Sequence, residues 1–358
     1  MSVLARAALP CLRLLPAEAA HDLTLRALAL GLVRVRAAPP DPILRTRLWG
    51  RDFPNPIGLA AGFDKNALVP DAMLRLGFGF VEIGSVTPLP QAGNPKPRIF
   101  RLAEDAAVIN RLGFNNDGLA IVAARLAARR RHGGAADRSG IVGANIGKNR
   151  DAPDAVADYE AGVTAFAPLA DYLVVNISSP NTPGLRELQR RREVTALIER
   201  LLAARRAASP GREPPLLVKI APDLSEEERG DLADVALTSG IDGLIVSNTT
   251  VTRPPDLRGG HAHEPGGLSG KPLFALSTAL LAEMYRRTQG RVPLIGVGGI
   301  ASGADAYAKI RAGASLVQLY TGLAYQGPGL IARIKHELAT LLRRDRFASL
   351  AEAVGSGG

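Results

Sequence analysis

Residues 174–182 read VVNISSPNT, and the abrupt change of polarity in this stretch is the pattern from which the fold is inferred. Val174 and Val175 begin it as a buried strand begins, and amide and hydroxyl side chains then follow up to Thr182, interrupted by Pro180. Burying such groups without hydrogen-bond partners costs about 1–3 kcal/mol each. The stretch therefore predicts either a surface turn or a strand whose polar end forms the floor of a binding site.

The same theme, a short apolar run with a polar or glycine-rich end followed by a helical pattern, occurs eight times along the chain. Continuous apolar runs that alternate with helices indicate parallel strands covered on both faces, and eight such units favour a (β/α)₈ barrel over an open sheet. In one of the helices, Ser225 and Glu228 have the spacing of a capping box, and Gly240 lies near its C-terminal end. The eight runs are PIGLAAG (56–62), FVEIGSV (80–86), IVGANIG (141–147), YLVVNIS (172–178), LLVKIAP (216–222), GLIVSNT (243–249), PLIGVGG (293–299) and SLVQLYT (315–321).

The polar ends of these strands are predicted to converge, because the C-terminal ends of barrel strands form one mouth. They include FDKN (63–66), NIGKN (145–149), NISSPNT (176–182), SNTT (247–250) and YTG (320–322). The hypothesis that follows for VVNISSPNT is a strand that delivers its polar tip to a shared site.

Glycines and lysines at this mouth indicate an anionic, planar ligand. GVGGI (296–300) and YTG (320–322) occupy the positions at which many barrels bind a phosphate, although such turns also serve plain packing. Lys219 has three interpretations: a Schiff-base lysine, a fixed cation beside a cofactor that gains negative charge on reduction, or a salt-bridged structural lysine. Lys65 raises the same choice. Several asparagines supply the paired donors and acceptors that suit a heterocycle rich in C=O and N–H groups: Asn110, Asn145, Asn176, Asn181 and Asn248.

Composition narrows the class of protein. The formal net charge is +10, but the aromatic content is only 4%, which leaves few stacking platforms, so no nucleic-acid binding is expected. The one cysteine, Cys11, permits no internal disulfide, no CxxC metal site and no iron–sulfur cluster, and it indicates a reducing compartment. No apolar stretch approaches the roughly 20 residues that span a bilayer.

The N-terminal stretch differs from the rest of the chain. Leucines at 25, 28 and 32 and Val35 fall on one helical stripe, while arginines such as Arg34 and Arg36 lie off it or near its end. This pattern is typical of an amphipathic hairpin resting in a membrane interface, and equally of a helix packed on the body of the protein. The segmentation is therefore residues 1–40 as a membrane-associating extension, 41–346 as the barrel and 347–358 as a tail.

With these residues assembled, the sequence resembles dihydroorotate dehydrogenase, in its class 2, quinone-dependent branch. The resemblance extends from about His21 to about Lys335. It implies an FMN-containing barrel that oxidises dihydroorotate to orotate in pyrimidine biosynthesis. The motifs that carry it, in chain order, are NPIGLAAGFDK, EIGSVTPLPQAGNPKPRIFRL, INRLGFNN, GANIGKN, NISSPNTPGLR, VKIAPDLS, SNTT, GGLSGKPL, IGVGGI and GASLVQLYTG.

The resemblance also implies roles for individual residues. The catalytic base falls on Ser179, Lys219 stabilises the reduced flavin, and Gly299 with Tyr320 and Thr321 holds the phosphate. The implied FMN contacts are Ala61, Gly62, Phe63, Asp64, Lys65, Ser85, Asn145, Asn176, Lys219, Ser247, Gly270, Gly299, Tyr320 and Thr321. The implied substrate contacts are Lys65, Asn110, Arg111, Leu112, Gly113, Phe114, Asn176, Asn181, Asn248 and Thr249.

The branch has an independent argument. Class 1 members use a cysteine as the base, and this chain has none besides Cys11, far from any predicted strand. The resemblance assigns His21 and Arg101 to the quinone entry beside the N-terminal helices, with a packed structural His21 as the alternative. A serine is a poor base alone, so a water or hydroxyl relay, with Thr182 as one member, is expected to remove the proton. The protein is expected to be a monomer, peripheral at the cytoplasmic face of the inner membrane.

Several other functions are alternatives to this one. They are another FMN barrel acting on a reduced pyrimidine, a dihydrouridine synthase acting on RNA, a Schiff-base lyase or aldolase using Lys219, and a membrane-docked binding module without catalysis.

Residues 251–272 are too long and too rich in Gly and Pro for a simple turn, and are interpreted as a lid or a flexible excursion. The tail after Arg346 has no site character.

Overall fold

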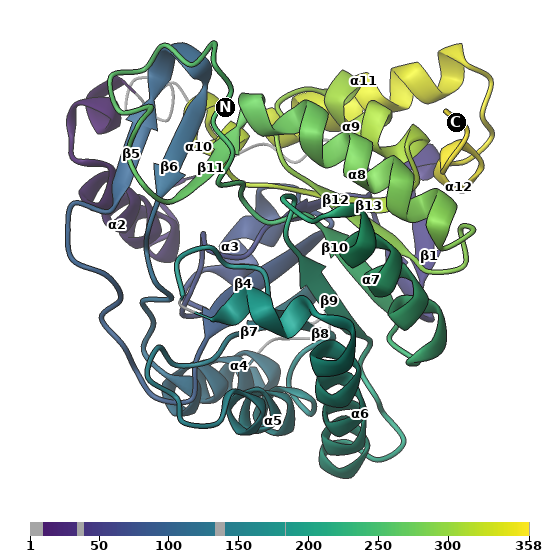
Figure 1. Ribbon diagram of the computed structural model, residues 1–358. Helices are drawn as coiled ribbons and strands as arrows, with labels where there is room; N and C mark the ends of the chain where they lie inside the picture. The colour runs from purple at the N-terminus through teal and green to yellow at the C-terminus, as the bar shows by residue number, and fades with distance from the viewer. Residues whose placement is uncertain (1–9, 34–38, 133–139, 183, 358) are drawn as a thin grey trace.

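The fold is a closed barrel of eight parallel strands surrounded by helices (Figure 1). The computed structural model describes residues 10–33, 39–132, 140–182 and 184–357. Every run predicted to be a barrel strand contains one, so the (β/α)₈ prediction is confirmed. The strands, in their order around the barrel, are β3 (Ile57–Leu59), β4 (Phe80–Val86), β7 (Ile141–Ile146), β8 (Tyr172–Asn176), β9 (Leu216–Ile220), β10 (Gly243–Val246), β12 (Leu294–Val297) and β13 (Ala314–Leu319).

Helices cover the outside of the barrel because the strands are apolar on both faces. Helix α7 begins behind Ser225, and the reciprocal hydrogen bonds of Ser225 and Glu228 confirm the predicted capping box. The α-helices are α2 (Ala17–Ala29), α3 (Pro70–Arg75), α4 (Leu119–His132), α5 (Ala155–Phe166), α6 (Arg191–Ala208), α7 (Glu226–Thr238), α8 (Phe274–Arg287), α9 (Gly303–Arg311), α10 (Thr321–Gln326), α11 (Leu330–Arg344) and α12 (Leu350–Ala353). Short 3₁₀ helices span Pro42–Leu44, Ala103–Asp105, Leu185–Gln189 and Lys271–Leu273.

Large side chains fill the lower half of the barrel interior, which closes it at that end. The rings of Phe80 and Tyr172 fit there because glycines face them: a Cβ on Gly58 would lie 2.2 Å from the Phe80 ring, and one on Gly143 would lie 2.1 Å from the Tyr172 ring. A hairpin of β1 (Thr46–Leu48) and β2 (Arg51–Phe53) covers this end. Any ligand must therefore enter from the opposite, C-terminal ends of the strands.

A small antiparallel sheet, which the sequence did not predict, stands beside the open end. It consists of β5 (Ile99–Leu102), β6 (Ala107–Asn110) and β11 (Gly267–Gly270). Since β11 lies within 251–272, the end of that stretch is a paired strand and not a flexible excursion, while its interpretation as a lid stays a prediction. Arg253 fixes the preceding turns, because its guanidinium donates to the carbonyls of Ala262, Glu264 and Gly266.

The N-terminal segment packs against this sheet. Glu18 on α2 pairs with Arg98 at 2.6 Å and with Lys96 at 3.2 Å. The expected apolar stripe is only partly correct: Leu28 is buried and Leu25 is partly buried against the core, but α2 ends at Ala29 and Leu32 is exposed. The remaining members of that prediction, Arg34, Val35 and Arg36, lie outside the described residues. Within the described part of the chain, no helix has the length and apolar character needed to cross a membrane.

The C-terminal residues are packed against the barrel's outer layer. Leu350 and Ala353 of α12 are fully buried, and the Gly355 N–H donates to the Ile310 carbonyl at 3.1 Å. The segment lies near α9 and α11, away from the open end of the barrel (Figure 1).

Candidate active site

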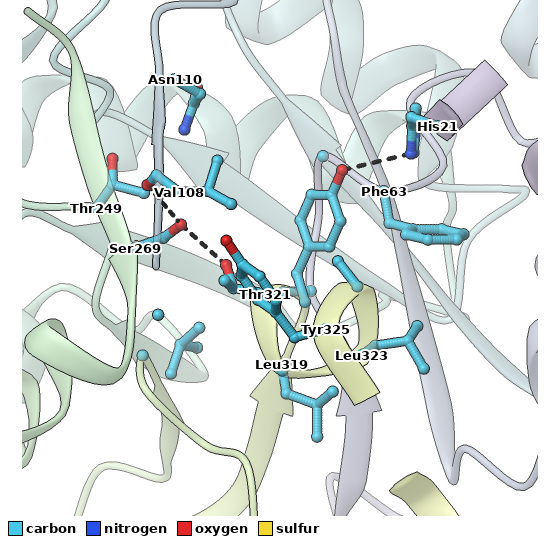
Figure 2. Close-up of a pocket in the computed structure, with 18 of the residues that line it drawn as sticks. His21, Phe63, Val108, Asn110, Thr249, Ser269, Leu319, Thr321, Leu323 and Tyr325 are labelled. Carbon is cyan, nitrogen blue, oxygen red and sulfur yellow. Dashed lines mark hydrogen bonds between the residues drawn. The ribbon is translucent and has the colours of Figure 1, made fainter. Parts of the chain in front are cut away.

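A cavity of about 950 Å³ lies at the C-terminal ends of the barrel strands, beside α2 and the small sheet. Its volume is in the range of natural small-molecule sites. Figure 2 shows side chains from these separate parts of the chain around it, with His21 on one side and Asn110, Thr249 and Ser269 on the other. The sequence-predicted residues that line it are Ala61, Gly62, Phe63, Lys65, Ser85, Asn110, Leu112, Gly113, Phe114, Asn176, Ser179, Asn181, Lys219, Ser247, Asn248, Thr249, Gly270, Gly299, Tyr320 and Thr321.

The cavity floor is polar because three strands end there in amides or hydroxyls. Asn176 ends β8, and its Nδ2 donates to the Ser85 Oγ of β4 at 2.9 Å. Asn248 follows β10, and its Nδ2 donates to the Asn176 Oδ1 at 3.2 Å. The polar end of VVNISSPNT is thus a binding floor rather than a surface turn.

Two lysines add positive charge to this floor. Lys219 of β9 makes no ion pair with any residue that the structure describes, which does not favour its interpretation as a salt-bridged structural lysine. Burial lowers the pKa of Lys219, and the charge of Glu82 opposes that shift. Burial also lowers the pKa of Lys65 to about 8, while Glu18 acts in the opposite direction. Both ammonium groups therefore lie where an anion would replace their lost hydration.

Ser179 lies on the loop after β8, and this loop is held in place by a guanidinium. The Arg186 Nε donates to the Ser178 carbonyl at 3.2 Å, and its Nη1 donates to Asp223 at 3.1 Å. Ser179 is buried, and its Oγ accepts a hydrogen bond from the Asn181 N–H at 3.3 Å. Thr182 is buried too but does not line the cavity. The Ser179 hydroxyl is thus fixed at the cavity wall, and the relay through Thr182 stays a prediction.

The glycine-rich side has the features of a phosphate cradle. Gly299 has φ +77°, and a Cβ there would lie 2.4 Å from the Phe274 Cβ, so this position requires glycine. The backbone N–H groups of Gly299 and Thr321 donate to no acceptor among the described residues. Ser269 bridges the Thr321 Oγ1 at 2.9 Å and the Val108 carbonyl at 3.1 Å (Figure 2). Uncommitted N–H groups on a backbone that approaches closely suit a phosphate group, and this part of the cavity has that form.

The opposite side of the cavity is aromatic and apolar. The His21 ring contacts the Phe63 ring edge-on at a centroid distance of 5.2 Å, and its Nδ1 lies 3.5 Å from the Tyr320 hydroxyl (Figure 2). Burial, assisted by the charge of Lys65, lowers the pKa of His21 to about 3, so the ring is neutral near pH 7. Its Nε2 is buried without a partner among the described residues. An unpartnered polar atom in an apolar wall is suited to a ligand carbonyl.

Arg101, the second residue expected at this entry, also lines the cavity. Its Nη1 donates to the Leu15 carbonyl at 2.7 Å and to the Arg13 carbonyl at 3.0 Å. Arg13 belongs to the helical turn at residues 10–14, and Leu15 follows that turn directly. Arg101 therefore fastens the N-terminal segment to β5 in addition to facing the cavity.

Three predicted contacts do not line the cavity. Asp64 is fully buried and accepts the N–H groups of Leu68 and Val69, which occupies both carboxylate oxygens, and burial raises its pKa. Asn145 lies below the floor and supports Ser85. The Arg111 guanidinium turns to the small sheet, where it pairs with Glu264 at 2.7 Å. Its side chain is therefore committed elsewhere, and a direct substrate contact from it is not supported.

Two buried charges near the site were not predicted from the sequence. Glu82 lies inside the barrel beneath Asn145, and the sequence signal was a lone carboxylate within the apolar run FVEIGSV. Lys309 of α9 donates to Ser277 at 2.8 Å and to Thr278 at 2.9 Å, behind the ring of Phe274, and burial lowers its pKa to about 7. On an amphipathic helix, nothing in the sequence marks Lys309 as buried.

Comparisons with known proteins identify the family of this chain. The family model described as dihydroorotate dehydrogenase matches residues 43–342. The dihydroorotate dehydrogenase (quinone) of Rhodospirillum rubrum is 58% identical over 98% of this chain and 94% of its own length. That of Parvibaculum lavamentivorans is 60% identical over 97% of both chains. A crystal structure of the Eimeria tenella enzyme in complex with ferulenol has a TM-score of 0.91 and 46% identity over 95% of each chain. The chain belongs to the dihydroorotate dehydrogenase family, in its class 2, quinone-dependent branch.

Proposed function

We infer that the protein oxidises (S)-dihydroorotate to orotate in pyrimidine biosynthesis, with FMN as hydride acceptor and a membrane quinone as terminal acceptor. One observation carries this inference: a single cavity joins a floor of amides, hydroxyls and two lysines to a wall of apolar and aromatic side chains. A polar heterocycle and a lipid-soluble acceptor would thus reach opposite sides of one cofactor. The family of the chain supports the same reaction.

The cavity residues fit FMN in shape and in chemistry. When bound, FMN supplies the hydride acceptor and carries two electrons to the second substrate. The Gly299 and Thr321 N–H groups would hold the phosphate, while Lys219 would lie by the ring system as a fixed cation. Lys219 would favour negative charge that develops there, since a buried ammonium without a carboxylate partner gains most from an added anion.

The substrate is expected to bind over the polar floor. Amide side chains at Asn110, Asn176, Asn181 and Asn248 match the carbonyl and N–H groups of the pyrimidine ring. Lys65 is suited to the substrate carboxylate, because its ammonium is otherwise poorly compensated. Ser179 would take the proton from the ring methylene while hydride leaves the adjacent carbon. Its hydroxyl is weakly basic, so this proton must be passed on through a relay.

The N-terminal segment would admit the quinone. Five of the ten exposed large apolar side chains among the described residues lie there, namely Leu14, Leu15, Leu23, Leu30 and Leu32. Together with Arg13 and Arg26 they have the composition of a segment that rests in a membrane interface. We propose peripheral attachment at the cytoplasmic face of the inner membrane, His21 Nε2 as a donor or acceptor toward the quinone, and a monomer as the functional state.

An absorbance experiment tests the reaction. Purified protein should show an oxidised flavin spectrum that dihydroorotate bleaches under anaerobic conditions and that a soluble quinone restores. A colourless protein, or a flavin that dihydroorotate leaves oxidised, would contradict the proposal. Faster reoxidation by fumarate or NAD⁺ than by quinone would contradict the assignment of the acceptor.

A further inference from the structure

Glu82 is a carboxylate in the centre of the barrel, fully buried and without contact with the cavity. It accepts three hydrogen bonds: from the Asn145 Nδ2 at 2.8 Å, from the Gln318 Nε2 at 2.7 Å and from the Tyr172 hydroxyl at 3.2 Å. All three partners donate, as they must toward a carboxylate, which has no hydrogen to give. The proposed reaction gives Glu82 no task.

From Glu82 a chain of hydrogen bonds leads up to the substrate side of the cavity. Asn145 donates to Glu82, and its Oδ1 accepts the Ser85 hydroxyl. The Ser85 Oγ accepts the Asn176 Nδ2 at 2.9 Å, and the Asn176 Oδ1 accepts the Asn248 Nδ2 at 3.2 Å. The Asn248 Oδ1 in turn accepts the Thr249 N–H at 2.8 Å. Five consecutive links thus run in one direction, each donor nearer the cavity and each acceptor nearer Glu82.

The direction of this chain decides what the cavity offers a ligand. An asparagine amide has two orientations of similar shape that exchange its donor and its acceptor. With Nδ2 directed at Ser85, Asn176 keeps its second amide hydrogen without an acceptor among the described residues. That hydrogen is available to a carbonyl of the ligand. In the reversed chain, an amide oxygen would occupy the same position and would repel that carbonyl.

Gln318 shows how strongly the carboxylate imposes direction. Its Nε2 donates a hydrogen bond to Glu82, although its Oε1 is then buried without a partner among the described residues. Since a buried orphan oxygen is costly, the hydrogen bond to the carboxylate must outweigh that cost. The same preference at Asn145 fixes the first link of the chain and, through it, the direction of the Ser85 hydroxyl. The backbone N–H groups of Ser178 and Thr249, which can only donate, hold Asn176 and Asn248 in the matching orientation from above.

We propose that Glu82 is a positioning residue that sets the donor and acceptor pattern of the substrate floor from below, through Asn145, Ser85 and Asn176. This proposal rests on the proposed use of the cavity for a pyrimidine. It assigns Glu82 a role in ligand recognition without any contact with the ligand.

The test compares orotate affinity by isothermal titration calorimetry on FMN-loaded protein for three variants. Glu82→Gln has the same shape but can donate or accept, so the lower links at Asn145 and Ser85 can reverse and no longer support the orientation of Asn176. Orotate binding should therefore weaken about tenfold. The double variant Glu82→Gln/Gln318→Glu moves the carboxylate across the 2.7 Å contact. Gln at position 82 would then donate to Glu at position 318 and present its oxygen to Asn145. The original direction returns, and affinity should recover to within about threefold of wild type.

Tyr172→Phe is the matched control, because it removes one donor from the same carboxylate without touching the chain. It should leave orotate affinity near that of wild type. The proposal fails if folded Glu82→Gln binds orotate as tightly as wild type, or if the double variant binds no better than Glu82→Gln. If Glu82→Gln does not fold, the double variant decides: near-wild-type affinity supports the proposal, and weak binding by a folded protein overturns it. Wild-type protein that bound no orotate would instead refute the proposed function.

Discussion

The two ends of the cavity are built in opposite ways. On the polar floor, nearly every amide is engaged by another, as with Asn176 between Ser85 and Asn248, and a buried carboxylate orients the set. On the apolar side, His21 has one ring nitrogen without a partner among the described residues and is kept neutral by burial. The difference indicates that the floor is preorganised for one specific ring, whereas the apolar side tolerates a mobile acceptor.

The largest effect on the polar end of the cavity is expected from a substitution at Ser179. Ser179→Ala should slow flavin reduction by dihydroorotate by about 10²–10⁴-fold, the usual contribution of a positioned proton acceptor. Orotate binding should be largely intact, because the hydroxyl lies at the wall and the amides remain. Stopped-flow absorbance under anaerobic conditions measures the rate, and near-wild-type flavin reduction would remove Ser179 from the mechanism.

A pH series tests the contribution of the Lys65 charge to ligand binding on the polar floor. With its pKa lowered to about 8, Lys65 is protonated below that pH and loses its charge as the pH rises through it. The affinity for orotate, which carries a carboxylate, should therefore fall about tenfold between pH 7 and pH 9. Calorimetry across this range measures the effect.

Lys65→Met provides the control for this series. It should bind orotate weakly at every pH and show no inflection near pH 8. An unchanged inflection in that variant would assign the titration to another group.

The apolar side is tested at His21. His21→Phe keeps the aromatic packing against Phe63 but removes the ring nitrogens. Reoxidation of reduced flavin by a soluble quinone should slow about fivefold, the equivalent of one hydrogen bond of about 1 kcal/mol. Because the pKa of His21 is about 3, the wild-type rate of this half-reaction should show no His21 titration between pH 5 and pH 8. A step in that window abolished by His21→Phe would contradict the neutral state.

The smallest effect is expected far from both ends. Ser225→Ala removes the N-cap of α7, whose Oγ accepts the Glu228 N–H at 3.2 Å. The free energy of unfolding should fall by about 1 kcal/mol, and both half-reactions should keep their wild-type rates. Chemical denaturation measures the first quantity. A catalytic defect in this variant would show that the capping of α7 affects the geometry of the cavity.

The parts of the fold that repeat were predictable, and the parts that depend on distant partners were not. The barrel strands could be inferred because each apolar run ends at a polar or glycine residue and eight runs fill one barrel. The small sheet was missed because β5, β6 and β11 lie outside the repeating pattern of an apolar run followed by a helix, and β11 lies in a stretch rich in glycine and proline. A strand outside that repeat, paired with partners far along the chain, gives no such signal in the sequence.

The site also contains some residues that could be predicted from the sequence and others that could not. Lys219, Ser179 and Asn176 follow directly from their positions at strand ends, and they line the cavity. Glu82 was visible only as an odd charge in an apolar run, since its role depends on Asn145 and Gln318, which other strands bring to it. Arg111 lies in the same short segment as residues 112–114, which do line the cavity, yet its guanidinium reaches Glu264 instead. A motif places a backbone segment, while the direction of a long side chain is decided by its partners.

The most direct test measures both half-reactions by stopped flow in Ser179→Ala and His21→Phe side by side. The two-ended cavity predicts that Ser179→Ala slows flavin reduction while quinone reoxidation keeps its wild-type rate, and that His21→Phe does the reverse. If both variants slow the same half-reaction, or each slows both equally, the two ends of the cavity do not divide the chemistry between them.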